Sequence, residues 1–498
     1  MPLLYPAIGS GTLERNRVTP FRRSLMRLAA SLLLATAALA TQSANAADSR
    51  LGDSYKFAQS GWTYVHLTGT PEQIGFQHGS LLAREIEDNV HVYAVEAPVL
   101  TKRDWAFYRE TARTMLWPHI EPEYQAELQG IADGLKSQGS KLDVWDVVAL
   151  NAQEDLATYY VPWLDKKEKV ADPPKLAAPS HCSAFIATGS ATKDGKIVIA
   201  HSNWSSYAEG ERWHYVFDIV PKHGEHFFMD GSAGIITSQD DFGVNAAGLM
   251  ITETTLPTTV GFDPDGIPEF ERSRKAMQYA TSIDEYAAIM RKGNNGGYQN
   301  SWMIGDRKTG EIAYLELGLK HTPLTKKTDG YFVSSNFAAD PALIRDDTPT
   351  FDPTDNRKSS VARHARAEDL VQQHYGEIDT TFAQQYLSDH YDATSRRVGG
   401  SLRTLCGHME MSSESDPPFD SFGAVSGKVM DSDMAAKLTF IARAGHPCGE
   451  DFHAAPFFAA HPEFAWQKPI LNDMIAGPWT SFHAGEKSPG TVVGAVER

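Results

Sequence analysis

Two short apolar runs decide the fold of this chain: Cys182-Ser183-Ala184-Phe185-Ile186-Ala187-Thr188 and Ile197-Val198-Ile199-Ala200-His201, separated by the turn Lys193-Asp194-Gly195-Lys196. β-prone residues on both sides of an Asp-Gly turn predict an antiparallel hairpin. The outer ends of two such strands lie side by side, so we expect Cys182 to lie near His201 and Asn203. A shift of one residue in register would turn these side chains to opposite faces.

The sequence before the hairpin divides into a helical block and a loop. An edge-like strand at 64–69 is followed by Thr70-Pro71-Glu72-Gln73, which supplies an N-cap, a proline at the first helical position and a capping-box glutamine. Apolar residues then recur at helical spacing, so residues 47–160 are predicted to be mainly helical. Residues 161–181 lack this periodicity and contain Pro173-Pro174, which predicts an exposed loop.

Strands and helix pairs are predicted to alternate after the hairpin. Strand-like runs occur at 214–220, 248–254 and 301–306, and a helical pair at 270–279 and 284–291. Meandering strands covered by helix pairs indicate two stacked antiparallel sheets with helices outside them, an α+β fold. We therefore expect residues 182–498 to form the domain that bears the hairpin and Cys182.

The N-terminal 46 residues have the features of a secretory signal peptide. Five arginines precede a short apolar run, and Ala44-Asn45-Ala46 provides a small-x-small cleavage site. Arg22-Arg23 also resembles a twin-arginine signal, which would indicate export after folding. We expect a periplasmic or secreted protein without stable membrane insertion, because the apolar run is too short to span a bilayer.

The charge balance argues against nucleic acid as a partner. The chain has 46 Lys and Arg against 63 Asp and Glu, a formal charge of −17. Removal of residues 1–46 takes away five arginines and one glutamate, which leaves 41 basic and 62 acidic residues and a charge of −21. Such a surface repels phosphate backbones and anionic lipid. The sequence says nothing about self-association.

Three cysteines are present, an odd number in a chain expected to be exported. Cys406 and Cys448 form a candidate disulfide, which leaves Cys182 either as a buried apolar residue or as a reactive thiol. No His-Glu-x-x-His or Cys-x-x-Cys run occurs, and His223 and His226 lie in a predicted turn. Gly-x-Ser-x-Gly and Walker-type motifs are also missing, so we expect no metal and no cofactor.

Cleavage of the bond between His181 and Cys182 would give Cys182 a special chemistry. A free α-amine titrates near working pH, so an N-terminal cysteine carries a general base beside its own thiol. The thiol could also attack the preceding peptide bond and so cut the chain itself. An asparagine side-chain N–H is a suitable donor to the oxyanion that forms.

Several runs together resemble the phospholipase B-like family. They are residues 182–184, 200–207, 240–242, 248–249, 253–255, 298–303 and 423–429. That family belongs to the N-terminal-nucleophile hydrolases. The N-terminal runs 69–71, 74–79 and 130–134 are similar to the related autoproteolytic family typified by acyl-coenzyme A:6-aminopenicillanic acid acyltransferase. The resemblance implies a four-layer αββα sandwich.

The resemblance also implies roles for individual residues. Cys182 would be the nucleophile and the new N-terminus, His201 or Asn203 would orient it, and Asn300 would help to form the oxyanion hole. Trp204 would line the substrate pocket. Ser205 stands where the acyltransferases carry aspartate, so the choice between His201 and Asn203 stays open. Without the resemblance, the sequence is also compatible with structural roles, His201 as a strand-end histidine bonded to backbone and Asn300 as a turn residue before a strand.

The expected function is an exported hydrolase that cleaves acyl amide or ester bonds through a thioester on Cys182. Its substrate would be a small acyl compound or a lipid, and transfer to an amine could compete with hydrolysis. An uncut hydrolase with a Cys182–His201 pair is a second hypothesis. A non-catalytic acyl- or lipid-binding protein of the same fold is a third.

Overall fold

The computed structural model describes residues 48–173, 182–238, 242–412 and 421–487 of the 498-residue chain. The chain divides into two units, Met1–Ser49 and Arg50–Arg498, and the second contains every strand described below. The signal peptide predicted for residues 1–46 and His181 of the predicted cleavage site lie outside the described residues.

Two sheets form the centre of the second unit. The larger has nine strands in the order β1 (Tyr55–Gln59), β2 (Trp62–Gly69), β5 (Tyr215–Pro221), β6 (Phe227–Gly231), β7 (Gly243–Asn245), β8 (Leu249–Thr255), β9 (Asn300–Asp306), β10 (Glu311–Glu316) and β11 (Leu324–Lys327). The smaller has six, in the order β12 (Gly330–Ser334), β3 (Cys182–Gly189), β4 (Gly195–Ser206), β15 (Phe422–Asp431), β16 (Thr439–Ala444) and β17 (Thr480–His483). A separate ribbon pairs β13 (Tyr391–Asp392) with β14 (Arg397–Val398). Neighbouring strands are antiparallel except β2 and β5, which are parallel.

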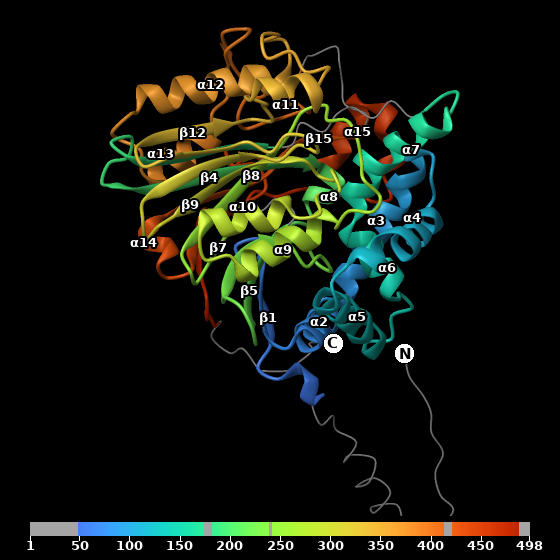
Figure 1. Cartoon of the computed structure of the whole chain (residues 1–498). Coiled ribbons are helices and arrows are strands. Elements are labelled where there is room, and N and C mark those ends of the chain that lie inside the picture. The colour runs from blue at the N-terminus through green and yellow to red at the C-terminus, as the bar shows by residue number, and fades with distance from the viewer. Residues whose placement is uncertain (1–47, 174–181, 239–241, 413–420, 488–498) are drawn as a thin grey trace, which may run out of the picture. The chain divides into compact units, whose positions relative to one another are not determined.

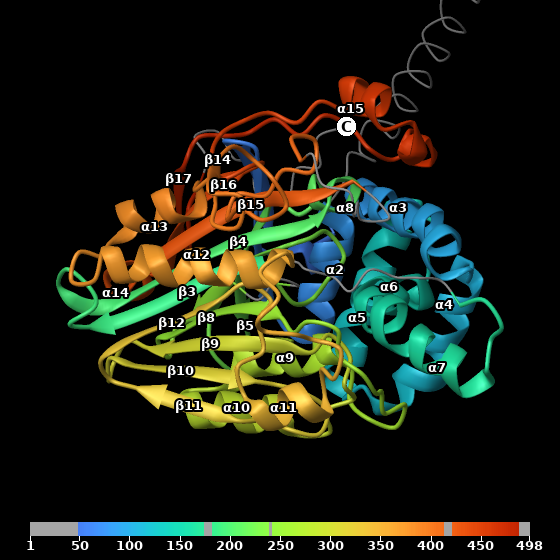
Figure 2. The ribbon, with the colours of Figure 1, turned by 90° about the horizontal axis from the view of Figure 1, so that it is seen from above.

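Helices cover the outer faces of both sheets (Figures 1 and 2). The nine-stranded sheet packs against α9 (Glu269–Tyr279) and α10 (Ile283–Arg291), and against a helical block of α2 (Pro71–Leu81), α3 (Ala83–Thr101), α4 (Trp105–Thr111), α5 (Pro122–Ser137) and α6 (Val144–Asn151). The six-stranded sheet packs against α12 (Ser359–Gln373) and α13 (Thr380–Leu387). Shorter helices are α7 (Val161–Glu168), α8 (Tyr207–Gly210), α11 (Pro341–Asp346), α14 (Ser432–Ala435) and α15 (Ala454–Ala460).

Alternating side chains explain why the sheets stack. In β4, Ile197 and Ile199 enter the core between the two sheets, whereas Val198 and Ala200 face α12 and α13. Strands buried on both faces read as continuous apolar runs, which is why 197–200 lacks polar alternation. The layers are helix, sheet, sheet and helix, so the predicted αββα sandwich is confirmed.

Helices α2 and α5 pack closely because glycines line their contact. A Cβ on Gly79 would lie 2.0 Å from the carbonyl oxygen of Ile131, and one on Gly75 would lie 2.0 Å from that of Glu127. Both contacts are with backbone, which cannot move aside without bending α5. The predicted capping box at Thr70 and Gln73 begins α2.

The structure corrects the predicted boundaries of the N-terminal region. Strand 64–69 is no edge strand, because β2 lies between β1 and β5. Residues 47–160 therefore contribute two strands to the larger sheet. The predicted loop at 161–181 begins with α7, whose Asp165 is buried and accepts a hydrogen bond from Arg103 at 2.6 Å. The helix is held by an ion pair with a residue far away in the sequence. Apolar periodicity cannot reveal such a contact, so the sequence pattern missed the helix.

The described helices lack the features of membrane-spanning segments. In the ranges that the structure describes, none combines the length and the apolar character that a membrane span needs.

Candidate active site

The β3–β4 hairpin brings Cys182, His201 and Asn203 together, as the sequence predicts. Cys182 is the first residue of β3 and pairs with Asn203 of β4, while Ala184 pairs with His201. Side chains alternate along each strand, so Cys182 shares a face of β3 with Ala184, and His201 and Asn203 share a face of β4 with Ile199. Ala184 and Ile199 enter the core between the sheets, so all three side chains face the nine-stranded sheet. Cys182 is 1% exposed in this uncut chain.

A glutamate from the other sheet completes the polar cluster around the thiol. Glu253 of β8 lies with its Oε1 3.9 Å from Sγ of Cys182. One ring nitrogen of His201, this Sγ and a carboxylate oxygen of Glu253 all lie within 4.8 Å of one another. Such a trio of donors could also hold an ion. Glu253 is fully buried.

Asn300 lies against Glu253, the carboxylate beside the thiol. With its amide oriented to satisfy both atoms, Asn300 donates to Oε2 of Glu253 at 3.3 Å and to the carbonyl of Gln299 at 3.1 Å. The hydroxyl of Tyr298 donates to Oε1 of the same carboxylate at 3.4 Å. Tyr298 has a φ of 37°, a left-handed conformation that is rare for a bulky residue and costs energy. The turn before β9 therefore holds Tyr298 and Asn300 against Glu253.

Asn336 and Arg363 hold the backbone of Cys182. The amide N of Cys182 donates to Oδ1 of Asn336 at 3.0 Å, and Nη2 of Arg363 donates to the same oxygen at 2.8 Å. Nη1 of Arg363 also donates to the carbonyl of Cys182 at 2.5 Å and to Oγ of Ser183 at 2.9 Å. Burial lowers the pKa of Arg363 to about 9. The first residue of β3 is thus fixed on both its N–H and its C=O.

Asn203 presents an amide group toward this cluster. Its Nδ2 is buried and has no hydrogen-bond partner within the described part of the chain. Buried polar groups are nearly always paired, so an unpaired donor beside a thiol indicates a place where a ligand oxygen can bind.

A buried ion pair lies next to His201. Lys428 of β15 pairs with His201 in the sheet, and its Nζ is 2.7 Å from Oδ2 of Asp230. The ring of His201 stacks at 6.3 Å on Phe242, which also lies under the Lys428 ammonium. His201 therefore lies between the sheets with both an aromatic ring and a buried ion pair as neighbours.

Trp204 lies on the opposite face of β4 from Asn203. It packs with Cys406 and Ala424 and donates weakly to the carbonyl of Leu405 at 3.4 Å. The guanidinium of Arg363 lies 4.3 Å above its ring. The structure therefore places Trp204 behind the strand that bears Asn203, in contact with a residue that holds Cys182, and not beside the thiol.

The predicted disulfide is not formed in this structure. Cys406 and Cys448 are both free thiols, and each Sγ lies beside Nε2 of His408, at 3.3 and 3.4 Å. Sequence reasoning missed His390 and His408 as neighbours of this pair, because their separation along the chain matches no short metal motif.

Sequence reasoning also missed Glu253, Asn336 and Arg363 as individual site residues. A signal existed for Glu253, a charged residue inside the otherwise uncharged strand 249–255. Asn336 carries a backbone signal, a left-handed φ of 60°, but only the structure reveals it. Arg363 lies in a helix with many polar residues, so nothing in its sequence distinguishes it from a solvent-exposed arginine.

Comparisons with known proteins bear on this site. The family model described as Phospholipase B matches residues 83–315, which include Cys182, Asn203, Glu253 and Asn300. Human "Phospholipase B-like 1" is 24% identical over 418 residues, which cover 74% of each chain. An uncharacterized protein of Archaeoglobus fulgidus is 24% identical over 265 residues, 49% of this chain and 41% of the relative. "Putative phospholipase B-like 1" of Caenorhabditis elegans is 26% identical over 46% of this chain and 42% of its own length. The match thus spans less than half the length of the archaeal and nematode relatives.

Among solved structures, a mutant of the conjugated bile acid hydrolase of Clostridium perfringens matches with a TM-score of 0.32 and 11% identity. The match covers 53% of this chain and 89% of the hydrolase.

Proposed function

Because the chain belongs to the phospholipase B-like family, we propose that it is an acyl hydrolase whose nucleophile is Cys182. It cuts itself between His181 and Cys182, then cleaves amide or ester bonds of small acyl compounds or lipids through a thioester. One observation carries the proposal: the first residue of β3 is a cysteine whose N–H, C=O and thiol each face a dedicated polar partner. A structural cysteine requires none of these.

The processing step is an N-to-S acyl shift. Sγ of Cys182 attacks the carbonyl carbon of His181, the C–N bond breaks, and the nitrogen gains the thiol proton to become the α-amine of Cys182. Water then hydrolyses the thioester, which releases the carboxyl group of His181 and restores the thiol. The chain is thereby divided into two fragments, and Cys182 becomes an N-terminal residue.

In the hydrolytic cycle the α-amine acts as the base. It takes the proton of Sγ as the thiol attacks the acyl carbonyl, and passes it to the leaving amine or alcohol. The same amine then takes a proton from the water that hydrolyses the thioester. Asn336 already accepts a hydrogen bond from this nitrogen, so it is well placed to orient the amine. Arg363 donates to the same Oδ1, and a cation so close opposes protonation of the amine and keeps it in the neutral form that can accept a proton.

Asn203 is the strongest candidate for the oxyanion donor. Its unpaired Nδ2 lies on the residue directly opposite Cys182. Asn300 and Tyr298 instead bind Glu253, so in this arrangement they fix the carboxylate beside the thiol. We assign His201 to the wall of the site. An uncut enzyme with a Cys182–His201 pair is the second candidate, because the donor atoms of these residues lie within 4.8 Å of each other.

Export is part of the proposal. It rests on the signal-like residues 1–46 and brings the enzyme to acyl compounds outside the cytoplasm. Because Cys182 is buried, substrate can reach the thiol only after the surroundings of this residue have rearranged.

The test is intact-mass and N-terminal analysis of the purified protein and its Cys182→Ala variant. We expect two fragments in the wild type, one beginning at Cys182, and a single chain in the variant. Val398→Ser, an exposed residue far along the sequence, is the matched control and should be processed normally. A single uncut chain in both proteins would refute the free-amine mechanism. If that uncut wild type hydrolysed acyl esters and lost the activity on His201→Ala, the Cys–His enzyme would replace it.

A further inference from the structure

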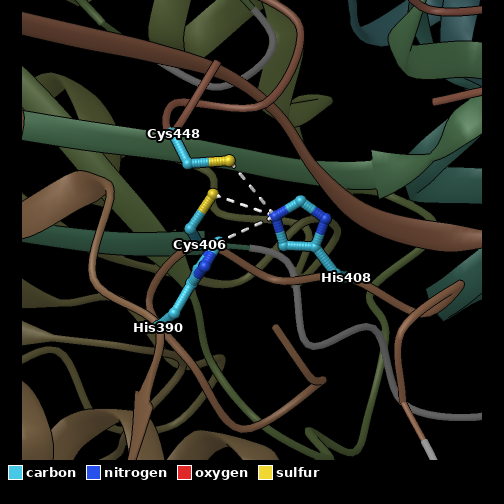
Figure 3. Close-up of side chains that lie close together, drawn as sticks. All are labelled: His390, Cys406, His408 and Cys448. Atoms are coloured by element: carbon cyan, nitrogen blue, oxygen red, sulfur yellow. Dashed lines mark hydrogen bonds between the residues drawn. The ribbon is translucent and has the colours of Figure 1, made fainter. Parts of the chain in front are cut away.

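A second cluster of chemically reactive side chains lies away from Cys182. Figure 3 shows His390, Cys406, His408 and Cys448 pointing toward one another. They come from three segments: the loop after α13, the loop between β14 and β15, and the turn after β16. All four donor atoms lie within 4.8 Å of one another. The cluster lies outside residues 83–315, the part that the family model matches.

Hydrogen bonding alone does not account for this geometry. Nε2 of His408 has three neighbours: Nε2 of His390 at 3.1 Å, Sγ of Cys406 at 3.3 Å and Sγ of Cys448 at 3.4 Å. An imidazole nitrogen offers one hydrogen or one lone pair, in the plane of the ring. One such nitrogen cannot bond three partners in different directions. An ion bound at the centre of the four donor atoms explains the arrangement more simply.

The separations match those of a tetrahedral metal site. With Zn–N of about 2.0–2.1 Å and Zn–S of about 2.3 Å, ligand atoms at the corners of a tetrahedron are about 3.3–3.8 Å apart. Around His408 the two N–S separations, 3.3 and 3.4 Å, lie at the lower end of this range, and the N–N separation of 3.1 Å lies slightly below it. A small outward movement of the side chains would therefore be enough to accommodate the ion.

The outer neighbours of His408 are those of a metal-bound imidazole. Its Nδ1 bonds Oε1 of Glu410 at 2.7 Å, and Oε2 of that carboxylate accepts from the hydroxyl of Tyr207 at 2.6 Å. A carboxylate on Nδ1 fixes the ring orientation and leaves the lone pair of Nε2 for a metal. This chain of contacts fixes the ligand before any ion binds.

Backbone hydrogen bonds hold the three segments in place. The amide of Cys406 donates to the carbonyl of Asp389, at 3.1 Å, and the amide of His408 to that of Ser401, at 3.2 Å. Oγ of Ser388 donates to the carbonyl of Pro447, the neighbour of Cys448, at 2.8 Å. Cys406 and His408 are fully buried, whereas His390 and Cys448 are partly exposed. The site is thus preformed on its inner side and open to entry on its outer side.

We propose that His390, Cys406, His408 and Cys448 bind one zinc ion. Two thiolates and two imidazoles are the donor set and number that zinc takes in structural sites, and such a set leaves no position for water or substrate. Binding releases the protons of the two thiols and leaves their oxidation state unchanged. The role is structural. The ion cross-links the loop after α13, the 399–412 loop and the turn after β16.

The site supports the strand that bears Asn203. Cys406 packs directly on Trp204, and a Cβ on Gly407 would lie 2.1 Å from the Trp204 ring. Arg363 lies on the other side of that ring and bonds the carbonyl of Cys182. Zinc therefore stiffens the back wall of the candidate active site. The binding itself does not depend on the proposed function.

The experiment measures metal in the full-length protein, purified under conditions that preserve thiols. We expect about one zinc per chain, and a chelator should lower the melting temperature. Replacement by Co²⁺ should give the visible bands of tetrahedral cobalt and a sulfur-to-cobalt charge-transfer band in the near ultraviolet. This spectrum is read on the wild type, so it does not depend on whether any variant folds.

Two variants assign the ligands. Cys448→Ser and His390→Ala change partly exposed ligands and should each weaken metal binding tenfold or more and alter the cobalt spectrum. His453→Ala is the matched control, because this exposed histidine bonds Asp473 outside the cluster and its loss should change neither. Three results would overturn the proposal. The first is a protein that holds no metal and has an intact mass lower by two hydrogen atoms, which indicates a disulfide between Cys406 and Cys448. The others are reduced protein that gives no cobalt bands and ligand variants that both retain zinc.

Discussion

Replacing Asn203 by leucine separates the proposed catalytic role of this residue from a structural one. The two side chains are similar in volume, and Asn203 is 1% exposed, so the change fills the same space. Its Nδ2 makes no hydrogen bond in the described structure, so leucine removes a buried unpaired donor and leaves no partner unsatisfied. Such a replacement is close to neutral for folding, within about 1 kcal/mol.

The effect on turnover should be much larger. Loss of one oxyanion donor raises the activation barrier by about 2.7–4 kcal/mol, a fall in kcat of about 10²–10³. The assay is hydrolysis of 4-nitrophenyl octanoate by the processed protein, together with urea unfolding followed by tryptophan fluorescence. We expect a loss of activity with little change in stability.

Asn245→Leu is the matched control and should behave in the opposite way. Asn245 is equally buried, but its Nδ2 donates to the carbonyls of Met277 and Ala280, at 3.0 and 2.9 Å, and its Oδ1 accepts from the amide of Leu249. Each buried group left unpaired costs about 1–3 kcal/mol. The folded Asn245→Leu protein should keep its kcat. If Asn203→Leu kept kcat within threefold, or lost as much stability as the control, the oxyanion assignment would be wrong.

Three further predictions concern stability and are read from urea unfolding. Gly79→Val should destabilise by at least about 1–3 kcal/mol, because its Cβ would meet the Ile131 carbonyl at 2.0 Å, and wild-type stability would contradict the close packing of α2 on α5. Asp230→Asn should cost about 3–5 kcal/mol by leaving Lys428 charged and buried, whereas the double variant Asp230→Leu/Lys428→Met should recover most of it; a double variant no better than the single one would refute this. Burial raises the pKa of Glu271 to about 8, above its value in the unfolded chain. The contribution of Glu271 to the free energy of unfolding is therefore full below about pH 4.3 and is lost as the pH rises toward 8, by up to about 1.4 kcal/mol per pH unit. Glu271→Gln should flatten that pH dependence, and an unchanged slope would mean that Glu271 is ionised in the folded protein.

The sequence by itself determined the hairpin and the layers. Apolar runs on both sides of an Asp-Gly turn predict the pairing of 182–188 with 197–201, whereas the register that places Cys182 opposite Asn203 comes from the structure. The cap at Thr70 likewise fixes the start of α2. Both features depend on residues that are close together in the sequence, so they can be read from it directly.

Tertiary structure alone decided what surrounds the thiol. Glu253, Asn336 and Arg363 are 71, 154 and 181 residues from Cys182, and they meet it because two sheets stack and α12 crosses one of them. The same applies to His390, Cys406, His408 and Cys448, which form one cluster from three segments. Contacts between residues so distant depend on the packing of whole layers, which no periodicity or short motif encodes. The sequence therefore predicts Cys182 as the nucleophile and the strand opposite it, whereas packing decides which groups surround its thiol.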